Sequence, residues 1–341
     1  MSNPVMCFGE IMLRLNPPGY ERIVQADSFV VSYAGAESTV AVNLACLGME
    51  SSFVSVIPDN PVGQSAINSL RRYGVDTSPV IRGGARLGTY FVEKGASQRG
   101  GQVVYDRAHS AVADADPGVY DWDAILANAR WFHVTGITPA ISTNAARACQ
   151  DALKTATAKG IPVSCDLNYR SGLWSRKQAN ETMTPLMGSV NVCIANDGAA
   201  KDVFGIEAAN PDAVVGHHSH EDDADVAAQL ARRFGFQTVA MTSRTSISAS
   251  RNTWSGLLYD GKDAYFSRSY DIDIVDRVGG GDGFASGLIY AIIDGRSPQA
   301  TIDFAVASSA LKHSIELDLD LVTRDEVELL ANGDGSGQVR R

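Results

Sequence analysis

The chain alternates short apolar strands with helices, and this order constrains its fold more than any other feature. Strands are predicted at residues 5–8, 52–57, 131–134, 162–166, 190–195 and 237–242, and helices at 37–47, 63–73, 144–159, 284–293 and 302–315. A strand followed by a helix, repeated along the chain, is typical of a parallel sheet with helices on both faces. We therefore predict a three-layer α/β/α sandwich with a mostly parallel sheet. Residues 247–250 and 254–259 are expected to form a late hairpin.

Two stretches interrupt this order with alternating apolar and polar residues. Residues 12–33 contain two such segments around a Pro-Pro-Gly turn, and residues 87–107 contain two more around a polar loop. Alternation with a period of two is typical of strands that expose one face. We predict that the four segments form a small β-sheet lid, which projects from a main domain made of residues 1–11, 34–86 and 108–331. The polar residues 332–341 are expected to be a disordered tail.

The composition disfavours several classes of function. The chain of 341 residues carries a formal net charge of −10, whereas nucleic-acid surfaces need clustered Lys and Arg, so no nucleic-acid partner is expected. We see no secretory signal and no apolar run near the ~20 residues of a membrane span, so a cytoplasmic protein without a membrane partner is expected. The five scattered cysteines are expected to be reduced thiols.

The segment Asp276-Arg277-Val278-Gly279-Gly280-Gly281-Asp282-Gly283-Phe284 carries the strongest chemical signal. Glycines let backbone amides approach an anion closely, and a helix that begins there adds partial positive charge. An aspartate on the same turn repels that anion, unless it acts on a neutral hydroxyl beside a bound phosphate. The pattern predicts phosphoryl transfer from a nucleotide to an alcohol, with Asp282 as the base and the amides of Gly279, Gly280 and Gly281 around the transferred group. The simpler alternative is that Asp282 only stabilises the helix N-terminus.

Polar residues also follow several predicted strands, where ligands bind in open parallel sheets. They are Glu10, Asp166, Asn168, Arg170, Asn196, Asp197, Thr242, Ser243 and Arg244. Asp166 is interpreted as a partner that orients Arg170. A separate cluster, His217, His218 and His220 with Glu221 to Asp223, could hold a metal, but its irregular spacing favours a solvated loop.

These residues resemble the ribokinase-like (phosphofructokinase-B type) family of sugar kinases. The glycine turn is similar to that family's D-x-x-G-A-G-D-x-F motif, and residues 34–37 are similar to its N-terminal motif. Residues 166–174 and 105–111 resemble the D-L-N-Y-R-x-x-L-W and Y-x-R-x-x-S-A segments of its 2-keto-3-deoxygluconate kinases. The resemblance implies ATP-dependent phosphorylation of a terminal hydroxyl of a sugar acid, most simply 2-keto-3-deoxygluconate to 2-keto-3-deoxy-6-phosphogluconate. It also implies Mg²⁺, optionally a monovalent cation, and a homodimer through the lid.

The resemblance assigns expected roles to individual residues. Sugar-acid contacts are expected from Gly35, Tyr90, Tyr105, Arg107, Asn168, Arg170 and Asp282. Nucleotide contacts are expected from Asn196, Thr242, Arg244, Gly279, Gly281 and His313, and no metal ligand is assigned. The arginines suit a carboxylate because a guanidinium can bind it bidentately. Alternatives are a surface ion pair for either arginine and a lid-core or dimer contact for Tyr90.

The chain departs from the family pattern at four positions: Ala34 replaces Gly, Thr39 replaces Asn, Ala199 replaces a Glu that supports the magnesium and phosphate network, and Gly280 replaces Ala. These departures keep two alternatives open, a kinase for a neutral sugar such as fructose or ribose and a catalytically impaired sugar-binding protein. A dinucleotide-binding oxidoreductase is disfavoured because no G-x-G-x-x-G follows the first strand.

Overall fold

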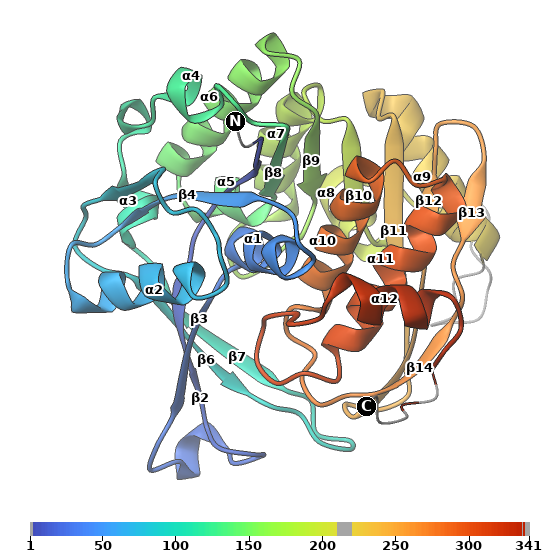
Figure 1. The fold of residues 1–341 in the computed structure, drawn as a ribbon, viewed down its shortest axis with the longest axis horizontal. Coiled ribbons are helices and arrows are strands. Elements are labelled where there is room, and N and C mark those ends of the chain that lie inside the picture. Colours follow the sequence, from blue (N-terminus) through green and yellow to red (C-terminus); the bar gives the residue numbers. More distant parts are fainter. Residues whose placement is uncertain (1–2, 210–219, 336, 338–341) are drawn as a thin grey trace.

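A ten-stranded sheet forms the centre of the molecule in the computed structural model, which describes residues 3–209, 220–335 and 337 (Figure 1). The strand order is β13 (Ala264–Phe266), β12 (Arg251–Tyr259), β11 (Thr238–Ser246), β10 (Val192–Ala195), β9 (Val163–Asp166), β8 (Trp131–Thr135), β1 (Val5–Phe8), β4 (Ser51–Ile57) and β5 (Val80–Arg82), with β14 (Tyr270–Asp273) paired to β12. The strands from β11 to β5 are parallel, and β12 is antiparallel to its three neighbours.

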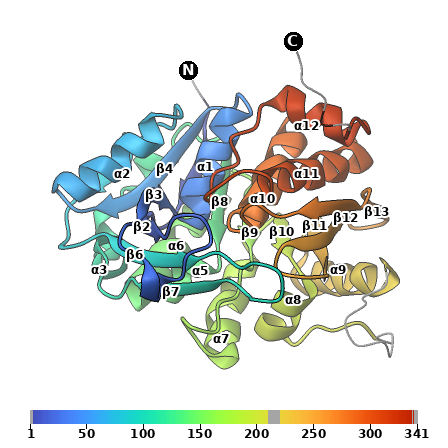
Figure 2. The same cartoon turned by 90° about the horizontal axis from the view of Figure 1, so that it is seen from below.

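Strand β1 shows why helices must cover both faces of this sheet. Val5 and Cys7 belong to one hydrophobic core, whereas Met6 and Phe8 belong to another, because successive side chains of a strand point to opposite faces. Figure 2 shows the resulting three layers. The first core packs on α1 (Ala36–Cys46), α2 (Pro61–Arg71), α10 (Gly280–Ile293), α11 (Pro298–Lys312) and α12 (Arg324–Ala331). The second packs on α3 (Ala111–Asp114), α4 (Trp122–Ile125), α5 (Ile137–Ile141), α6 (Thr143–Ala158), α7 (Arg176–Met187), α8 (Asp197–Phe204) and α9 (His220–Phe234).

A second sheet of four strands projects from this body (Figure 1). Its order is β3 (Val30–Ala34), β2 (Met12–Asn16), β6 (Gly88–Glu93) and β7 (Gln102–Asp106), with β2 and β6 parallel. Short 3₁₀ turns occur at Ile23–Gln25 and Pro117–Val119. The predicted α/β/α sandwich with a small separate sheet is confirmed. The division into domains and the homodimer stay predictions.

Two local predictions were wrong. The late hairpin joins β11 to β12, and residues 247–250 form its turn instead of a strand, because β11 continues to Ser246. Residues His220 to Asp223 start α9 and do not form a solvated loop: Asp222 and Asp223 are buried at its N-terminus, where negative charge is favoured. His217 and His218 lie outside the described residues, as do 336 and 338–341 of the predicted tail.

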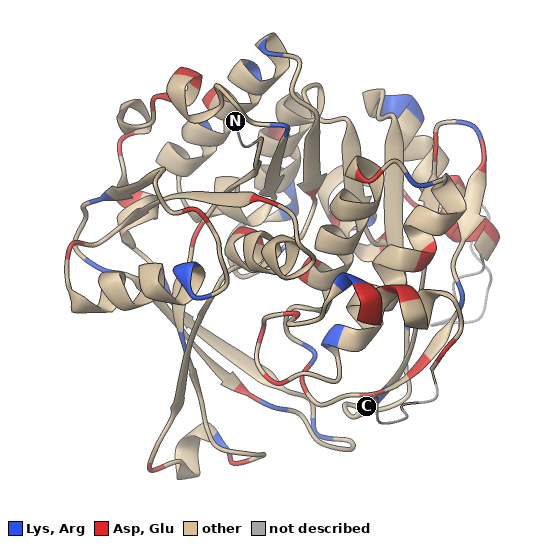
Figure 3. Cartoon of the chain, viewed as in Figure 1, with Lys and Arg blue, Asp and Glu red and all other residues tan. Residues whose placement is uncertain are grey.

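The distribution of charged residues and the free cysteines agree with what the composition predicts. In the view of Figure 3, Lys and Arg are interspersed with Asp and Glu along the ribbon. The five cysteines are free; four are buried and Cys46 is partly buried. Burial raises the pKa of the Cys46 thiol to about 11. In the described part of the chain, we find no helix with the length and apolarity to span a bilayer.

Candidate active site

A cavity of about 700 Å³ lies between the lid and the carboxyl ends of β9, β10 and β11. Almost all residues predicted for the site line it. They are Gly35, Tyr90, Tyr105, Arg107, Asn168, Arg170, Asn196, Thr242, Arg244, Gly279, Gly280, Gly281 and Asp282. His313 is the exception, since it is buried behind the glycine turn. The structure thus brings the predicted residues together, while their individual roles stay predictions.

The glycine turn leaves the N-terminus of α10 open toward this cavity. Helix α8 is capped by Asn196, whose Oδ1 accepts a hydrogen bond from the amide of Ala199 at 2.8 Å, whereas among the described residues no side chain caps α10. Gly279 has a φ of 87°, and a Cβ there would lie 2.0 Å from the carbonyl oxygen of Asp318. A Cβ on Gly281 would meet no described atom within 4 Å. Because the first amides of a helix lack internal partners, this open turn suits a phosphate.

Gly280 departs from the family alanine for a reason visible in the packing. A Cβ on Gly280 would lie 2.6 Å from Cε1 of His313, whose ring lies 5.0 Å from that of Trp254. The Nδ1 atom of His313 is 2.7 Å from the carbonyl oxygen of Ser309, so the ring has little freedom to move. Burial lowers the pKa of His313 to about 4, which makes the ring neutral near pH 7. His313 therefore supports the turn from behind.

Asp282 lies in the first turn of α10 and faces the cavity. Burial raises the pKa of Asp282 well above its usual value, and the carboxylates of Asp166 and Asp318 raise it further, while Arg170 opposes them. A carboxylate with a raised pKa binds a proton more readily, which is the property that a general base at a hydroxyl requires.

The two predicted substrate arginines differ in their surroundings. Nε and Nη2 of Arg107 both donate to Oε2 of Glu10, the Nε bond at 2.8 Å, and the guanidinium lies 5.5 Å from the centre of the Tyr105 ring. Arg170 is exposed at the cavity wall, and the ion pairs found among the described residues do not include it. Its Nη1 donates to the carbonyl oxygen of Tyr169 at 3.2 Å. Arg170 is thus the more available cation for an anionic ligand.

The chain turns sharply after β9 and so carries Arg170 to the cavity. Asn168 has a φ of 37°, a conformation that Asn tolerates better than most residues, and its amide donates to Oδ1 of Asp166 at 3.0 Å. Asp166 thus bonds to the turn that carries Arg170, while its interpretation as the partner that orients Arg170 stays a prediction. Burial raises the pKa of Asp166 to about 7.

Positive charge gathers near the glycine turn. Arg244 and Arg277 both line the cavity, and the pKa of Arg277 is lowered by burial and then by the charge of Arg244. Two cations held this close attract phosphate. Sequence reasoning named Arg244 but missed Arg277, although it stands inside the glycine motif.

The position of the missing family glutamate is filled by Ala199, but a carboxylate lies one helical turn further on. Asp202 on α8 also lines the cavity, and Arg176 pairs with it at 2.6 Å. Among the described residues, no group of three His, Cys, Asp or Glu side chains could enclose a metal ion. A cation here would therefore keep water and phosphate ligands, as Mg²⁺ commonly does.

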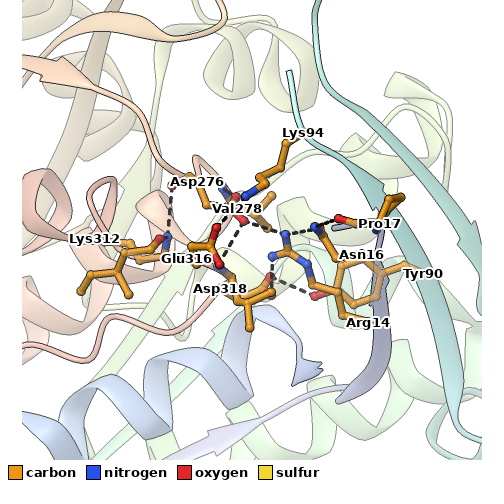
Figure 4. A network of polar contacts seen from close by, with 12 residues as sticks. Arg14, Asn16, Pro17, Tyr90, Lys94, Asp276, Val278, Lys312, Glu316 and Asp318 are labelled. Carbon is orange, nitrogen blue, oxygen red and sulfur yellow. Dashed lines mark hydrogen bonds and ion pairs between the residues drawn. The ribbon is translucent and has the colours of Figure 1, made fainter. Parts of the chain in front are cut away.

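A buried network joins the lid to the glycine turn, and the sequence did not indicate it (Figure 4). Arg14 on β2 is fully buried, and its guanidinium donates to Oδ2 of Asp318 and Oδ2 of Asp276, each at 2.7 Å. It also donates to Asn16 at 2.8 Å, and the hydroxyl of Tyr90 donates to Asp318 at 2.9 Å. Burial by itself would lower the pKa of Arg14, but Asp318 and Asp276 raise it above its usual value. Tyr90 therefore anchors the lid as well as lining the cavity.

Ala34 and Thr39, the remaining departures from the family pattern, do not line the cavity, although their neighbour Gly35 does. Gly35 lines the cavity, and a Cβ there would lie 1.9 Å from the carbonyl oxygen of Glu10, so backbone packing alone requires this glycine. Ala34 and Thr39 are buried, and the Thr39 hydroxyl has no hydrogen-bond partner among the described residues.

A parallel α/β/α sandwich, an open helix N-terminus, an aspartate in its first turn and a covering lid together define a kinase of small molecules. The model of the pfkB family carbohydrate kinases matches residues 2–314. A 2-dehydro-3-deoxygalactonokinase of Haloferax volcanii is 35% identical over 339 residues, covering 99% of both chains. The structure of a 2-dehydro-3-deoxygluconokinase of Thermotoga maritima matches with a TM-score of 0.94 and 46% identity, over 98% of this chain and 99% of that one. The chain belongs to the pfkB family of carbohydrate kinases.

Proposed function

We propose that the protein transfers the γ-phosphoryl group of ATP to the terminal hydroxyl of a 2-keto-3-deoxy sugar acid, with 2-keto-3-deoxygluconate as the first candidate. The observation that carries this proposal is a single cavity lined both by Arg170 and by the open glycine turn with Asp282. An exposed arginine suits the carboxylate of the sugar acid, and the turn suits the phosphates. Similarity to kinases named for the gluconate and the galactonate supports the sugar-acid class and leaves the C4 configuration to experiment.

In the proposed mechanism, Asp282 accepts the proton of the attacking hydroxyl. The amides at the start of α10 and the cations Arg244 and Arg277 stabilise the negative charge of the transferred group, and the lid excludes water. Mg²⁺, when bound, would neutralise phosphate charge, and Asn196 and Asp202, which line the cavity, would hold its water shell.

A substrate panel tests the proposal. ATP consumption is measured with 2-keto-3-deoxygluconate, 2-keto-3-deoxygalactonate, fructose and ribose. We expect kcat/KM to be highest for one of the two acids, and turnover confined to the neutral sugars would refute the proposal. A neutral sugar is the second candidate because Glu10 already neutralises Arg107. Only Arg170 then remains to bind a substrate carboxylate.

Replacing Arg170 with Gln separates the two candidates. If Arg170 binds the carboxylate, R170Q should raise KM for the sugar acid by about 10- to 100-fold, the range of 1.5–3 kcal/mol for a charged hydrogen bond. The KM for ATP should stay within about twofold of wild type, because removal of one ligand contact leaves the other site intact. Arg147→Gln is a matched control, since Arg147 is an exposed arginine on α6 that does not line the cavity. Equal KM values for the acid in R170Q and wild type would contradict the assignment.

Two neighbouring glycines make a second matched pair. Gly281→Ala should leave the melting temperature unchanged, because a methyl there meets no described atom, but it should raise KM for ATP by about tenfold through the lost close approach of phosphate. Gly280→Ala should instead destabilise the fold by about 1–3 kcal/mol through overpacking against His313. Thermal unfolding and steady-state kinetics read the two effects separately. The assignment fails if G281A unfolds like G280A or binds ATP normally.

A further inference from the structure

A lysine is buried directly beneath the glycine turn, and neither the predicted chemistry nor the lid network accounts for it. Lys312 is the last residue of α11, and its side chain is fully buried. Its ammonium donates to the carbonyl oxygens of Asp276 and Ile315, both at 3.1 Å (Figure 4). A buried ammonium is unfavourable unless it is paired and hydrogen-bonded, so the site is built around this cation.

The two carbonyls belong to the two segments that together shape the turn. Asp276 begins the glycine motif, and Ile315 precedes the loop that reaches Asp318. These segments touch twice: the amide of Leu317 donates to Oδ2 of Asp276 at 3.1 Å, and Gly279 packs against the carbonyl of Asp318. Leu317 has a φ of 67°, a strained conformation for leucine that only its surroundings can maintain. Lys312 bridges the segments at this strained contact.

The stem of Lys312 also contacts the helix that follows the turn. A Cβ on Gly283 would lie 3.3 Å from Cβ of Lys312, and Gly283 is the residue directly after Asp282. One side chain therefore contacts the start of the motif through its ammonium and the far end through its stem. Movement of Lys312 would shift the amides of the turn and the carboxylate of Asp282 together.

The two buried cations near the turn, Arg14 and Lys312, bind different kinds of oxygen. Arg14 binds the carboxylates of Asp276 and Asp318, whereas Lys312 binds main-chain carbonyl oxygens, the ligands that a bare metal cation would also use. Burial lowers the pKa of Lys312, and the nearby Asp276, Asp318 and Asp320 oppose this shift.

We propose that Lys312 is a positioning residue that serves as a built-in cation for the glycine turn, so that phosphoryl transfer by this protein needs no free monovalent cation there. The inference rests on the proposed kinase function for its activity readout. It replaces the optional monovalent cofactor that the family resemblance implied with a side chain of the protein itself.

The test combines wild type with Lys312→Met, which keeps most of the stem and removes the ammonium. Wild-type turnover should be equal in KCl, NH₄Cl and tetramethylammonium chloride at constant ionic strength. In tetramethylammonium chloride, the kcat of K312M should be about 100-fold below that of wild type, as expected for a misplaced reacting group. NH₄⁺ or K⁺ should restore kcat to about a tenth of the wild-type value or more. Lys262→Met, an exposed lysine on the β12–β13 turn, controls for loss of charge alone.

A second readout is independent of catalysis. The melting temperature of K312M should rise in NH₄Cl or KCl relative to tetramethylammonium chloride, while that of wild type should not respond. If K312M does not fold, the wild-type salt series still decides, because activation by K⁺ of fivefold or more would overturn the proposal. Loss of activity in folded K312M without rescue by either ion would also overturn it. If no sugar of the panel is turned over by wild type, the proposed substrate fails, while the melting series still tests Lys312.

Discussion

Replacing Asp282 with Asn is expected to reduce kcat by about 10²- to 10⁴-fold, the usual contribution of a general base, and to leave binding of the sugar acid largely intact. The amide keeps the size of the carboxylate but cannot take a proton from the hydroxyl. Single-turnover kinetics measures the chemical step, and calorimetry with the sugar acid measures binding. Near-normal turnover would show that Asp282 is not the base.

Stability separates this role from a merely structural one. Burial and neighbouring carboxylates disfavour the ionised form of Asp282, so the neutral amide should not lower the melting temperature. If Asp282 only complemented the helix dipole, D282N would instead lower the free energy of unfolding by about 0.3–1 kcal/mol and keep its activity.

The pH profile gives a finer control for the same residue. Because the pKa of Asp282 is raised in the free protein, the acid limb of kcat/KM should lie above the pH at which an ordinary aspartate titrates. Asp166 contributes to that shift, so Asp166→Asn should move the limb to lower pH. An unchanged limb in D166N would mean that another group controls it.

Replacing Arg14 with Met is expected to destabilise the protein by about 3–5 kcal/mol, because it leaves two buried carboxylates without their cation. Asp318 and Asp276 are each bonded to Arg14 at 2.7 Å, and Arg14 is fully buried. Denaturant unfolding measures the loss. Arg22→Met is the matched control, since this lid arginine is 53% exposed and pairs with Glu93, a pair expected to contribute at most about 1 kcal/mol. Losses of similar size in the two variants would contradict the view that Arg14 anchors the lid.

The same variant should affect substrate binding. Tyr90 donates to Asp318, so a displaced Asp318 frees the ring that lines the cavity. KM for the sugar acid should therefore rise in R14M and stay unchanged in R22M. This outcome would tie lid anchoring to the site, whereas an unchanged KM would limit Arg14 to stability.

Sequence reasoning succeeded where structure depends on neighbours in the chain. The glycine turn, the strand ends after 166 and 195 and the layered fold follow from local patterns, because glycines, helix starts and period-two segments act over a few residues. It failed where a residue is defined by distant partners. Arg14 looks like one polar residue in an alternating strand, and only the fold brings Asp276 and Asp318 to it. The helix at His220 was missed because its first turn is as polar as a loop.

The same limit applied inside the site. Arg107 matched a substrate motif, but its pairing with Glu10 depends on how the segments that follow β1 and β7 come together in the fold. Gly280 looked like a mild change from alanine, yet the ring of His313 leaves no room for a methyl. In both cases the residue type was informative, and its immediate neighbours decided what it can do.

The buried network of Arg14 also constrains the order in which the chain can fold during its synthesis. Arg14 is made early, but Asp276 and Asp318 follow it by 262 and 304 residues, so its charge stays uncompensated while most of the chain emerges from the ribosome. Strand β2 likewise pairs with β6, which is separated from it in the chain by β3, α1, β4, α2 and β5. Such non-local contacts form late because a long loop must close first. The N-terminal strand of the lid thus reaches its final environment only after α11 and the segment that carries Asp318 have been translated.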